Sequence, residues 1–197
     1  MQRRPNNKRP NLIVQGEEAR VFHLGRHKGR NVVVRRQVIP LFPDIIEGKK
    51  LRLQIGNLLF PRKIAKVVLG AKAGPQEIVT YHVKATPESV KAVEEYYKKI
   101  LKAGKRSVDN SKYPDYAPHA AKVERETRGI VGEMAKAGII VNPRPMNVLF
   151  RANNNRPVWF EVDRIEPEKV LAFIKKLPKE RQKAVRQKLR EWRENEK

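Results

Sequence analysis

The sequence predicts an α+β fold in which a β-rich first part precedes a helix-rich second part. β-branched residues cluster in short runs between Leu12 and Ile39, as in antiparallel strands. Thr86-Pro87-Glu88 then has the pattern of a helix start. Later, two apolar runs flank RANNNRP (151–157), a natural turn, and predict a hairpin between helices. This order predicts two lobes around a cleft.

In the first lobe, residues 12–39 are expected to form two or three antiparallel strands, and PLFP (40–43) to end them. Residues 44–59 have apolar side chains near helical spacing, so we expect a helix there, weakened by Gly48 and Gly56. The runs IAKVVLGA (64–71) and EIVTYHVKA (77–85) are interpreted as two further strands.

In the second lobe, helices are expected at 87–102 and 119–136, on either side of a loop rich in Asp, Asn and Pro. The hairpin follows, and Pro167 and Pro178 each start a further helix. Trp192 lies on the apolar side of the last helix, where it could pack against the body or stack on a base.

The predicted domains are a disordered basic arm (1–11), a β-rich N-lobe (12–85) and a helical C-lobe with a basic last helix (86–197). The arm, MQRRPNNKRPN, has too few large apolar side chains to order itself.

The composition favours a polyanionic partner. The chain of 197 residues has 44 Lys and Arg against 21 Asp and Glu, a net charge of +23. Self-repulsion on this scale favours contact with nucleic acid or another polyanion, and an acidic protein is a further candidate. No apolar run approaches the length of about 18 residues that crosses a membrane, so no membrane partner is expected. There is no cysteine, which fits a soluble cytoplasmic protein.

The segment 139–165 resembles the catalytic centre of protein kinases, where H-x-D-x-x-x-x-N precedes a hairpin and D-F-G. In this register, Asn142 occupies the position of the catalytic aspartate and Asn147 that of the asparagine. Glu161 occupies that of the metal-binding aspartate, with Asp163 as an alternative.

The first lobe extends the resemblance. VQGEEARVF (14–22) is similar to a kinase glycine-rich loop that retains Gly16 and Val21. Arg35 occupies the position of the phosphate-binding lysine, and Glu47 and Gln54 are the candidates for that residue's helical partner. The order of elements over about residues 12–175 resembles small kinases, such as the kinase subunit of the KEOPS complex and minimal bacterial effector kinases. The resemblance implies ATP and Mg²⁺ as cofactors.

The substitutions imply an eroded site. An amide at Asn142 cannot accept a proton, so phosphoryl transfer should be crippled. Arg35 can hold phosphate, but its planar fork does not reproduce the geometry of a lysine. Glu161 and Asn147 offer the hard oxygen ligands that Mg²⁺ prefers. In the alternative reading, Asn142 and Asn147 only cap turns, and Glu161 pairs with an arginine.

Residues 1–36 carry ten Lys and Arg against two Glu, a net charge of +8. Such segments bind phosphate backbones by releasing counterions. The predicted nucleic-acid contacts are Arg3, Arg4, Lys8, Arg9, Arg26, Lys28, Arg30 and Arg36.

The sequence thus predicts a kinase-like, pseudokinase-type protein that binds an acidic macromolecule, with RNA or a ribonucleoprotein favoured. One alternative is an active, atypical small Ser/Thr-type kinase that uses ATP and Mg²⁺. Another is a ribosome-associated or phage structural protein that binds nucleic acid and has no kinase ancestry.

Overall fold

The computed structural model describes residues 12–15, 19–37, 40–71, 73–96 and 115–196. It confirms the predicted α+β class, with a four-stranded antiparallel sheet in the first part and most of the helices in the second. The predicted arm (1–11) and the last part of the helix predicted at 87–102 lie outside the described residues.

The first part is a four-stranded antiparallel sheet in the order β1-β2-β3-β4. Its strands are Leu12–Gln15, Ala19–His27, Arg30–Gln37 and Glu77–Tyr81. The first three confirm the strands predicted at 12–39. Lys28 and Gly29 form the turn between β2 and β3 with positive φ angles of 48° and 75°, a conformation that glycine adopts at little cost.

Helix α1 (Pro43–Leu59) follows β3 and confirms the helix predicted at 44–59. Its two glycines do not interrupt it. A Cβ at position 56 would lie 2.7 Å from Cδ1 of Ile64 and 3.0 Å from Cγ2 of Val162. Gly56 therefore allows the helix to approach the segments that follow it and that follow the hairpin.

The prediction of a strand at 64–71 was wrong. These residues form only isolated bridges, from Ile64 to Trp159 and from Val67 to Thr80. The segment passes from the hairpin to the sheet and changes partner on the way, so no regular ladder forms. Ile64, Ala65, Val67 and Val68 are buried, although Leu69 is exposed, and this short apolar run explains why the sequence is similar to that of a strand.

The second part contains α2 (Pro87–Glu95), α3 (Tyr116–Lys136) and the hairpin of β6 (Val148–Phe150) and β7 (Pro157–Trp159). Strand β5 (Ile139–Ile140) pairs with β8 (Arg164–Ile165), and α4 (Pro167–Ile174) and α5 (Lys179–Asn195) complete the chain. The hairpin and the two helices that follow Pro167 and Pro178 are confirmed. Thr86 caps α2 by accepting a hydrogen bond from the Ser89 amide.

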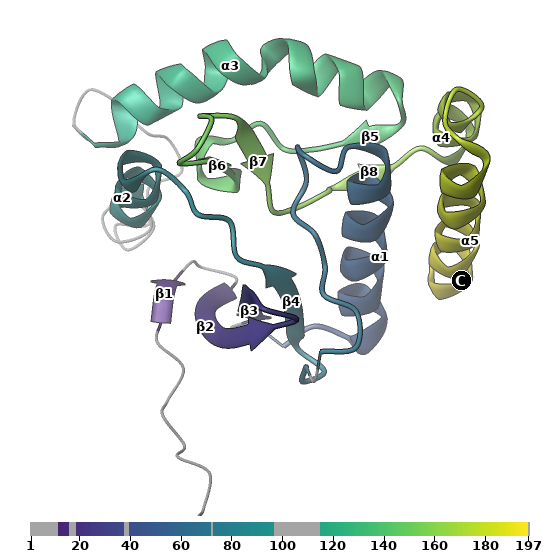
Figure 1. The fold of residues 1–197 in the computed structure, drawn as a ribbon, viewed down its shortest axis with the longest axis horizontal. Coiled ribbons are helices and arrows are strands. Elements are labelled where there is room, and N and C mark those ends of the chain that lie inside the picture. The colour runs from purple at the N-terminus through teal and green to yellow at the C-terminus, as the bar shows by residue number, and fades with distance from the viewer. Residues whose placement is uncertain (1–11, 16–18, 38–39, 72, 97–114, 197) are drawn as a thin grey trace, which may run out of the picture.

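Helix α1 stands at the centre of the molecule (Figure 1). The sheet lies at one end, α3 crosses above the β6–β7 hairpin, and α4 and α5 flank α1 on the side opposite the hairpin. The main core joins α1, α3, the hairpin and both last helices. Trp192 is only 6% exposed and belongs to this core, so it packs the last helix onto the body and is not available to stack on a base.

The order of sheet, helix, strand, helices and hairpin is the one that the kinase resemblance implied. Among the described helices, none combines the length and apolar character needed to cross a membrane.

Candidate functional site

A charged cluster lies where the sheet, α1 and the segment after the hairpin meet. Its centre is Glu161, which follows β7. One carboxylate oxygen lies 3.6 Å from a guanidinium nitrogen of Arg35 on β3, and the other lies 3.3 Å from the ammonium of Lys49 on α1. Arg52, one turn further along α1, donates a hydrogen bond of 3.1 Å from Nε to the Val162 carbonyl. Two predicted residues, Arg35 and Glu161, are thus in contact.

The secondary structure explains how these side chains meet. Arg35 pairs across the sheet with Ile78, which is buried in the main core, so both side chains lie on the face of the sheet toward α1. Lys49 and Arg52 are three residues apart and therefore lie on one side of α1. The close approach at Gly56 brings that helix against the segment that contains Glu161 and Val162.

The cluster is electrostatically dominated by its cations. Burial alone would raise the pKa of Glu161, but the positive charges of Arg35, Lys49 and Arg52 outweigh that effect and hold the pKa below its usual value. Glu161 is therefore a charged counter-ion at neutral pH, and it links three segments that are distant in the sequence.

Asp163 lies two residues further on and behaves differently. Burial and the negative charge of Glu161 raise the pKa of Asp163, against the opposing charges of Arg52 and Arg144. Its amide donates a hydrogen bond of 2.9 Å to the Ile140 carbonyl, so the β5–β8 pairing continues to this residue. That contact brings Asp163 beside the start of the loop that contains Asn142.

Asn142 and Asn147 lie in the same loop but in different turns. The side-chain oxygen of Asn142 accepts a hydrogen bond of 3.0 Å from the Arg144 amide, as in an Asx turn. Asn147 ends a short 3-10 helix (Pro145–Asn147), and its amide donates to the Arg144 carbonyl at 2.9 Å. From α3, His119 forms a 3.0 Å hydrogen bond between Nε2 and the Pro145 carbonyl and steadies the loop.

The proposed Mg²⁺ ligands, Asn147 and Glu161, remain a prediction. Both oxygens of Glu161 face a cation, so a metal ion would compete with Arg35 and Lys49 for this carboxylate. Within the described residues, no three His, Cys, Asp or Glu side chains gather as metal ligands.

The kinase resemblance also assigned roles to residues of the sheet and of α1. Gly16 lies outside the described residues. Val21 pairs with Arg35 across β2 and β3, so the two side chains share one face of the sheet. Neither Glu47 nor Gln54 is the helical residue that joins the cluster. Glu47 pairs with Lys50 on its own helix at 3.4 Å, and the residue directed at the cluster is Lys49.

The predicted nucleic-acid contacts divide into three groups. Arg3, Arg4, Lys8 and Arg9 lie outside the described residues. Arg26, Lys28 and Arg30 are exposed at the β2–β3 turn. Arg36 forms a 2.7 Å ion pair with Glu77, so its charge is already neutralised.

Sequence reasoning missed the cations of α1. Lys49 and Arg52 follow each other at a spacing of three in a predicted helix, which would have placed them on one side of it. The search for an acidic partner of Arg35 drew attention to Glu47 instead.

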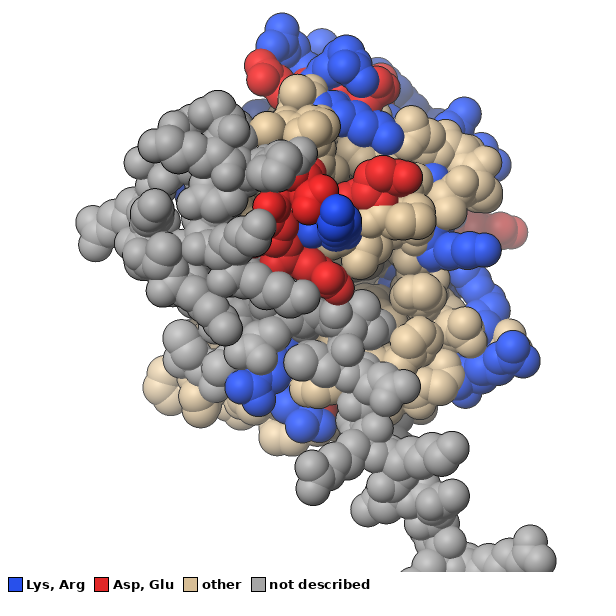
Figure 2. All heavy atoms as spheres, turned by 90° about the vertical axis from the view of Figure 1, so that its left-hand side faces the viewer, with Lys and Arg blue, Asp and Glu red and all other residues tan. Residues whose placement is uncertain are grey.

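An acidic surface lies apart from these cations. Helix α2 carries Glu88 and Glu94, and Asp115 precedes α3, whereas Glu95 is buried and accepts hydrogen bonds from the Asp115 and Tyr116 amides. Figure 2 views the side of the molecule where α2 and the beginning of α3 lie, and it shows acidic side chains close to basic ones. Lys91 and Asp115 form a 2.9 Å ion pair on this side.

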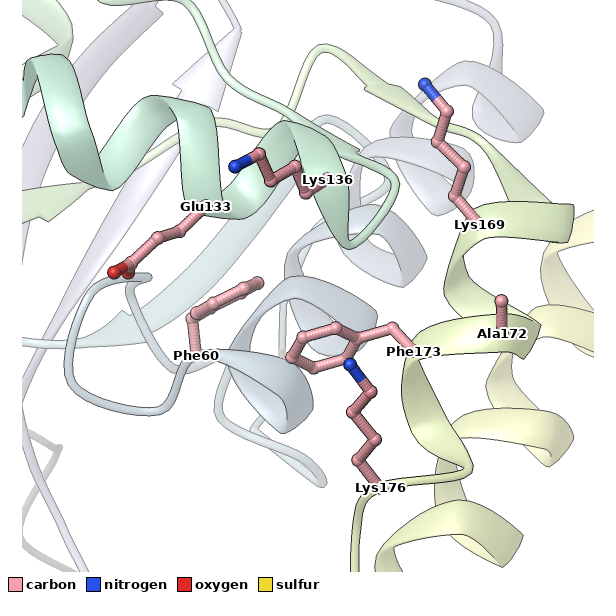
Figure 3. Close-up of a pocket in the computed structure, with 7 residues that line it drawn as sticks. All are labelled: Phe60, Glu133, Lys136, Lys169, Ala172, Phe173 and Lys176. Atoms are coloured by element: carbon pink, nitrogen blue, oxygen red, sulfur yellow. The ribbon is translucent and has the colours of Figure 1, made fainter.

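A separate pocket of about 540 Å³ lies between the ends of α1, α3 and α4. Figure 3 shows the rings of Phe60 and Phe173 side by side at its centre, with their centroids 5.8 Å apart. Lys136 and Lys176 lie at the ends of α3 and α4, where cations offset the partial negative charge of a helix end. The helix ends thus account for these two lysines without a ligand.

No protein-family model matches the chain, and no curated protein matches it. Among solved structures, it is similar to the apoenzyme of the macrolide 2'-phosphotransferase MphH from Brachybacterium faecium, with 15% sequence identity. That match covers 93% of this chain and 76% of the other, with a TM-score of 0.32. A likeness of this extent adds nothing to what the geometry of the chain itself implies about function.

Proposed function

We propose that the protein is a small kinase-like protein with eroded catalytic residues, which binds an acidic macromolecule and does not transfer phosphate efficiently. RNA or a ribonucleoprotein is the class of partner that the charge of +23 favours. The main observation that supports a loss of phosphoryl transfer is that Glu161 is paired with cations. It neutralises Arg35 and Lys49, while an amide at position 142 replaces a proton acceptor.

The chemistry supports this proposal. Phosphoryl transfer needs a group that orients the attacking hydroxyl and cations that neutralise the developing charge. The cluster supplies the cations in Arg35, Lys49 and Arg52. The side-chain oxygen of Asn142 is engaged in a turn, and an amide is not basic enough to accept a proton. ATP and Mg²⁺ are proposed as ligands on the kinase resemblance, and the phosphates of a bound nucleotide would meet these three cations.

Two measurements test the loss of transfer. ATP should raise the thermal unfolding temperature of the purified protein, and Lys49→Glu should remove that shift. With Mg²⁺ and ATP, neither autophosphorylation nor phosphate release should exceed that of the Lys49→Glu variant. Transfer that depends on Mg²⁺ and disappears in Glu161→Ala would instead establish an active atypical kinase.

One observation favours that second candidate. Asp163 is exposed, lies two residues from Glu161, and is joined by its amide to the strand that leads into the loop of Asn142. An active enzyme could use Asp163 in place of an acid at position 142. Asp163→Asn would then abolish phosphoryl transfer, whereas in a protein that only binds it should leave RNA binding unchanged.

The binding itself is tested by fluorescence anisotropy with a structured RNA at several salt concentrations. Affinity should fall steeply with salt, because phosphate contacts release counterions. RNA binding with no thermal shift from ATP would favour the nucleic-acid-binding protein without kinase ancestry. Absent or salt-insensitive binding would remove the proposed RNA partner.

A further inference from the structure

Two cations converge on one aromatic ring at the edge of the sheet. The guanidinium carbon of Arg30 lies 4.2 Å from the centroid of the Tyr81 ring, and the ammonium of Lys66 lies 5.8 Å from it. The Tyr81 amide also donates a 3.0 Å hydrogen bond to the Lys66 carbonyl, so the backbone fixes this arrangement. Cations are attracted to the face of an aromatic ring, which allows both to gather here despite their mutual repulsion.

A third cation approaches from the hairpin. Arg151 follows β6, and its backbone forms a bridge with Ala85, in the segment that leaves β4. Its side chain is partly buried. Burial and the positive charge of Arg30 lower the pKa of Arg151, because both disfavour the charged guanidinium. Arg30, Lys66 and Arg151 together are called the Tyr81 cluster below.

Within the part of the chain that the structure describes, the Tyr81 cluster has no counter-ion. Among the described residues, no carboxylate lies within 4 Å of the charged nitrogens of Arg30, Lys66 or Arg151. Arg36, only six residues from Arg30 on the same strand, has Glu77 at 2.7 Å. Like charges that are close together raise the free energy of the folded protein, and Arg151 is also partly buried, whereas Arg30 and Lys66 are exposed. A bound anion would lower this free energy, so the cluster is suited to bind an anion.

We infer that the Tyr81 cluster binds the phosphates of an RNA backbone. This inference rests on the proposed function and names the surface that performs it. Guanidinium groups form paired hydrogen bonds with phosphate, and two of the three cations are arginines. The Tyr81 ring already contacts two cations, so the surface offers charge and does not offer a free ring for base stacking. Recognition should therefore be independent of sequence. Arg26 and Lys28, exposed at the adjoining turn, extend the cationic surface.

The decisive experiment compares two triple variants that remove the same charge. The first is Arg30→Ala, Lys66→Ala and Arg151→Ala. The control is Arg128→Ala, Arg164→Ala and Arg193→Ala, which removes exposed arginines whose partners are Glu124, Glu166 and Glu168. Binding of the full chain to a labelled RNA duplex and to a labelled single strand is measured by anisotropy between about 50 and 200 mM salt.

The Tyr81-cluster variant should bind at least about 10-fold more weakly than the parent at the lowest salt concentration. Its slope of log K against log salt should be smaller by about 2 to 3, one counterion for each lost phosphate contact. The control should remain within about 3-fold of the parent, since its arginines are already paired. Circular dichroism and the thermal midpoint establish that both variants fold, and Arg30→Lys, which keeps the charge, should retain most of the affinity.

Each other outcome has a distinct meaning. Equal losses in the two triple variants would show that only total charge matters and would overturn the site. If the parent binds RNA and the Tyr81-cluster variant binds it equally well, the proposed site is wrong, but the proposed RNA partner is not contradicted. If the parent binds no RNA but binds poly-glutamate through the cluster, the ligand is an acidic protein, and both the proposed RNA partner and this inference are wrong.

Discussion

Two groups of cations in this molecule have similar composition and opposite surroundings. Around Glu161, Arg35 and Lys49 face carboxylate oxygens at 3.6 and 3.3 Å. Around Tyr81, Arg30 and Lys66 face an aromatic ring, and Arg151 is repelled by Arg30. The first group joins the sheet, α1 and the segment after the hairpin, so its charges serve the fold. The second has no carboxylate partner among the described residues, which is the basis for proposing that it binds an external anion.

The comparison also separates the functions that a high net charge can serve. A cation stabilises the fold where a carboxylate of the same chain pairs with it, and it can bind an external anion where no such carboxylate is near. The sequence alone does not distinguish a cation that pairs within the fold from one that is left to bind an external anion. Arg35 and Arg36 are adjacent, and each has an acid, whereas Arg30 on the same strand has a ring.

The largest expected effect is the loss of the acid in the first group. Glu161→Gln removes the charged carboxylate that the partly buried Arg35 and Lys49 both face and should lower the free energy of unfolding by about 3 kcal/mol. Urea denaturation measures this change. Glu124→Gln, in an exposed pair with Arg128 one helical turn away, is the control and should cost no more than about 0.5 kcal/mol. Equal costs would mean that the first group does not hold the fold together.

The next effect concerns the close approach that builds the first group. Gly56→Ala places a methyl group 2.7 Å from Ile64 and 3.0 Å from Val162, which should cost about 2 kcal/mol through overpacking. Gly132→Ala is the matched control, because it also lies in a helix but has open space around its Cβ. This control should gain up to about 1 kcal/mol from helix propensity. A stable Gly56→Ala would show that α1 can move away from the segment after the hairpin.

Removing one cation from each group should have opposite signs. Lys49→Met takes a charge from Glu161 and should destabilise the protein by about 1 kcal/mol. Arg151→Met removes a repelled and partly buried charge, so it should leave stability unchanged or raise it by about 0.5 kcal/mol. Thermal unfolding at low salt compares the two. If both variants lose stability equally, the two groups do not differ in the way proposed here.

The smallest effect is expected in the pH dependence of stability. The folded pKa of Glu161 is below its ordinary value of 4.5, so its contribution is complete above that pH and is lost as the pH falls through the folded pKa. Asp163 has the opposite sign. Its folded pKa is above 3.8, so the folded protein holds its proton longer and stability falls as the pH rises through that window.

Urea midpoints between about pH 3 and pH 7 test both signs. The acid-induced loss should be smaller in Glu161→Gln than in the parent. Asp163→Asn should raise stability at neutral pH by no more than about 0.5 kcal/mol. A parent profile that is flat below pH 4.5, or an Asp163→Asn variant that is clearly less stable, would contradict these assignments.

Elements with clear boundary residues were predictable from the sequence. Thr86-Pro87, Pro167 and Pro178 mark helix starts that the structure retains, because proline fits the first turn and ends what precedes it. The segment 64–71 was not predictable. Its backbone pairs with the hairpin at one end and with the sheet at the other, and the local sequence pattern does not indicate this change of partner.

The candidate site was predictable only in part. Arg35 and Glu161 were chosen through the kinase resemblance, and they are in contact. Lys49 was missed because the rotation of α1 was misjudged. Ile45 is 43% exposed, while the neighbouring Ile46 and Leu53 are buried. Helix α1 packs against the core on one side and against α5 on another, so its apolar face is too wide to indicate which side chains face Glu161. Arg151 depends on a pairing with residue 85, which no local pattern indicates.

The two tryptophans give the molecule built-in reporters. Trp159 in the hairpin has no exposed surface, Trp192 in α5 has 6%, and neither indole N–H has a hydrogen-bond partner among the described residues. Shielded from water in this way, both should emit at short wavelength and resist quenching by acrylamide. Because both belong to the main core, a change in their emission on adding RNA would indicate a change in the packing of the interior. Constant emission would indicate that the ligand binds to a preformed surface.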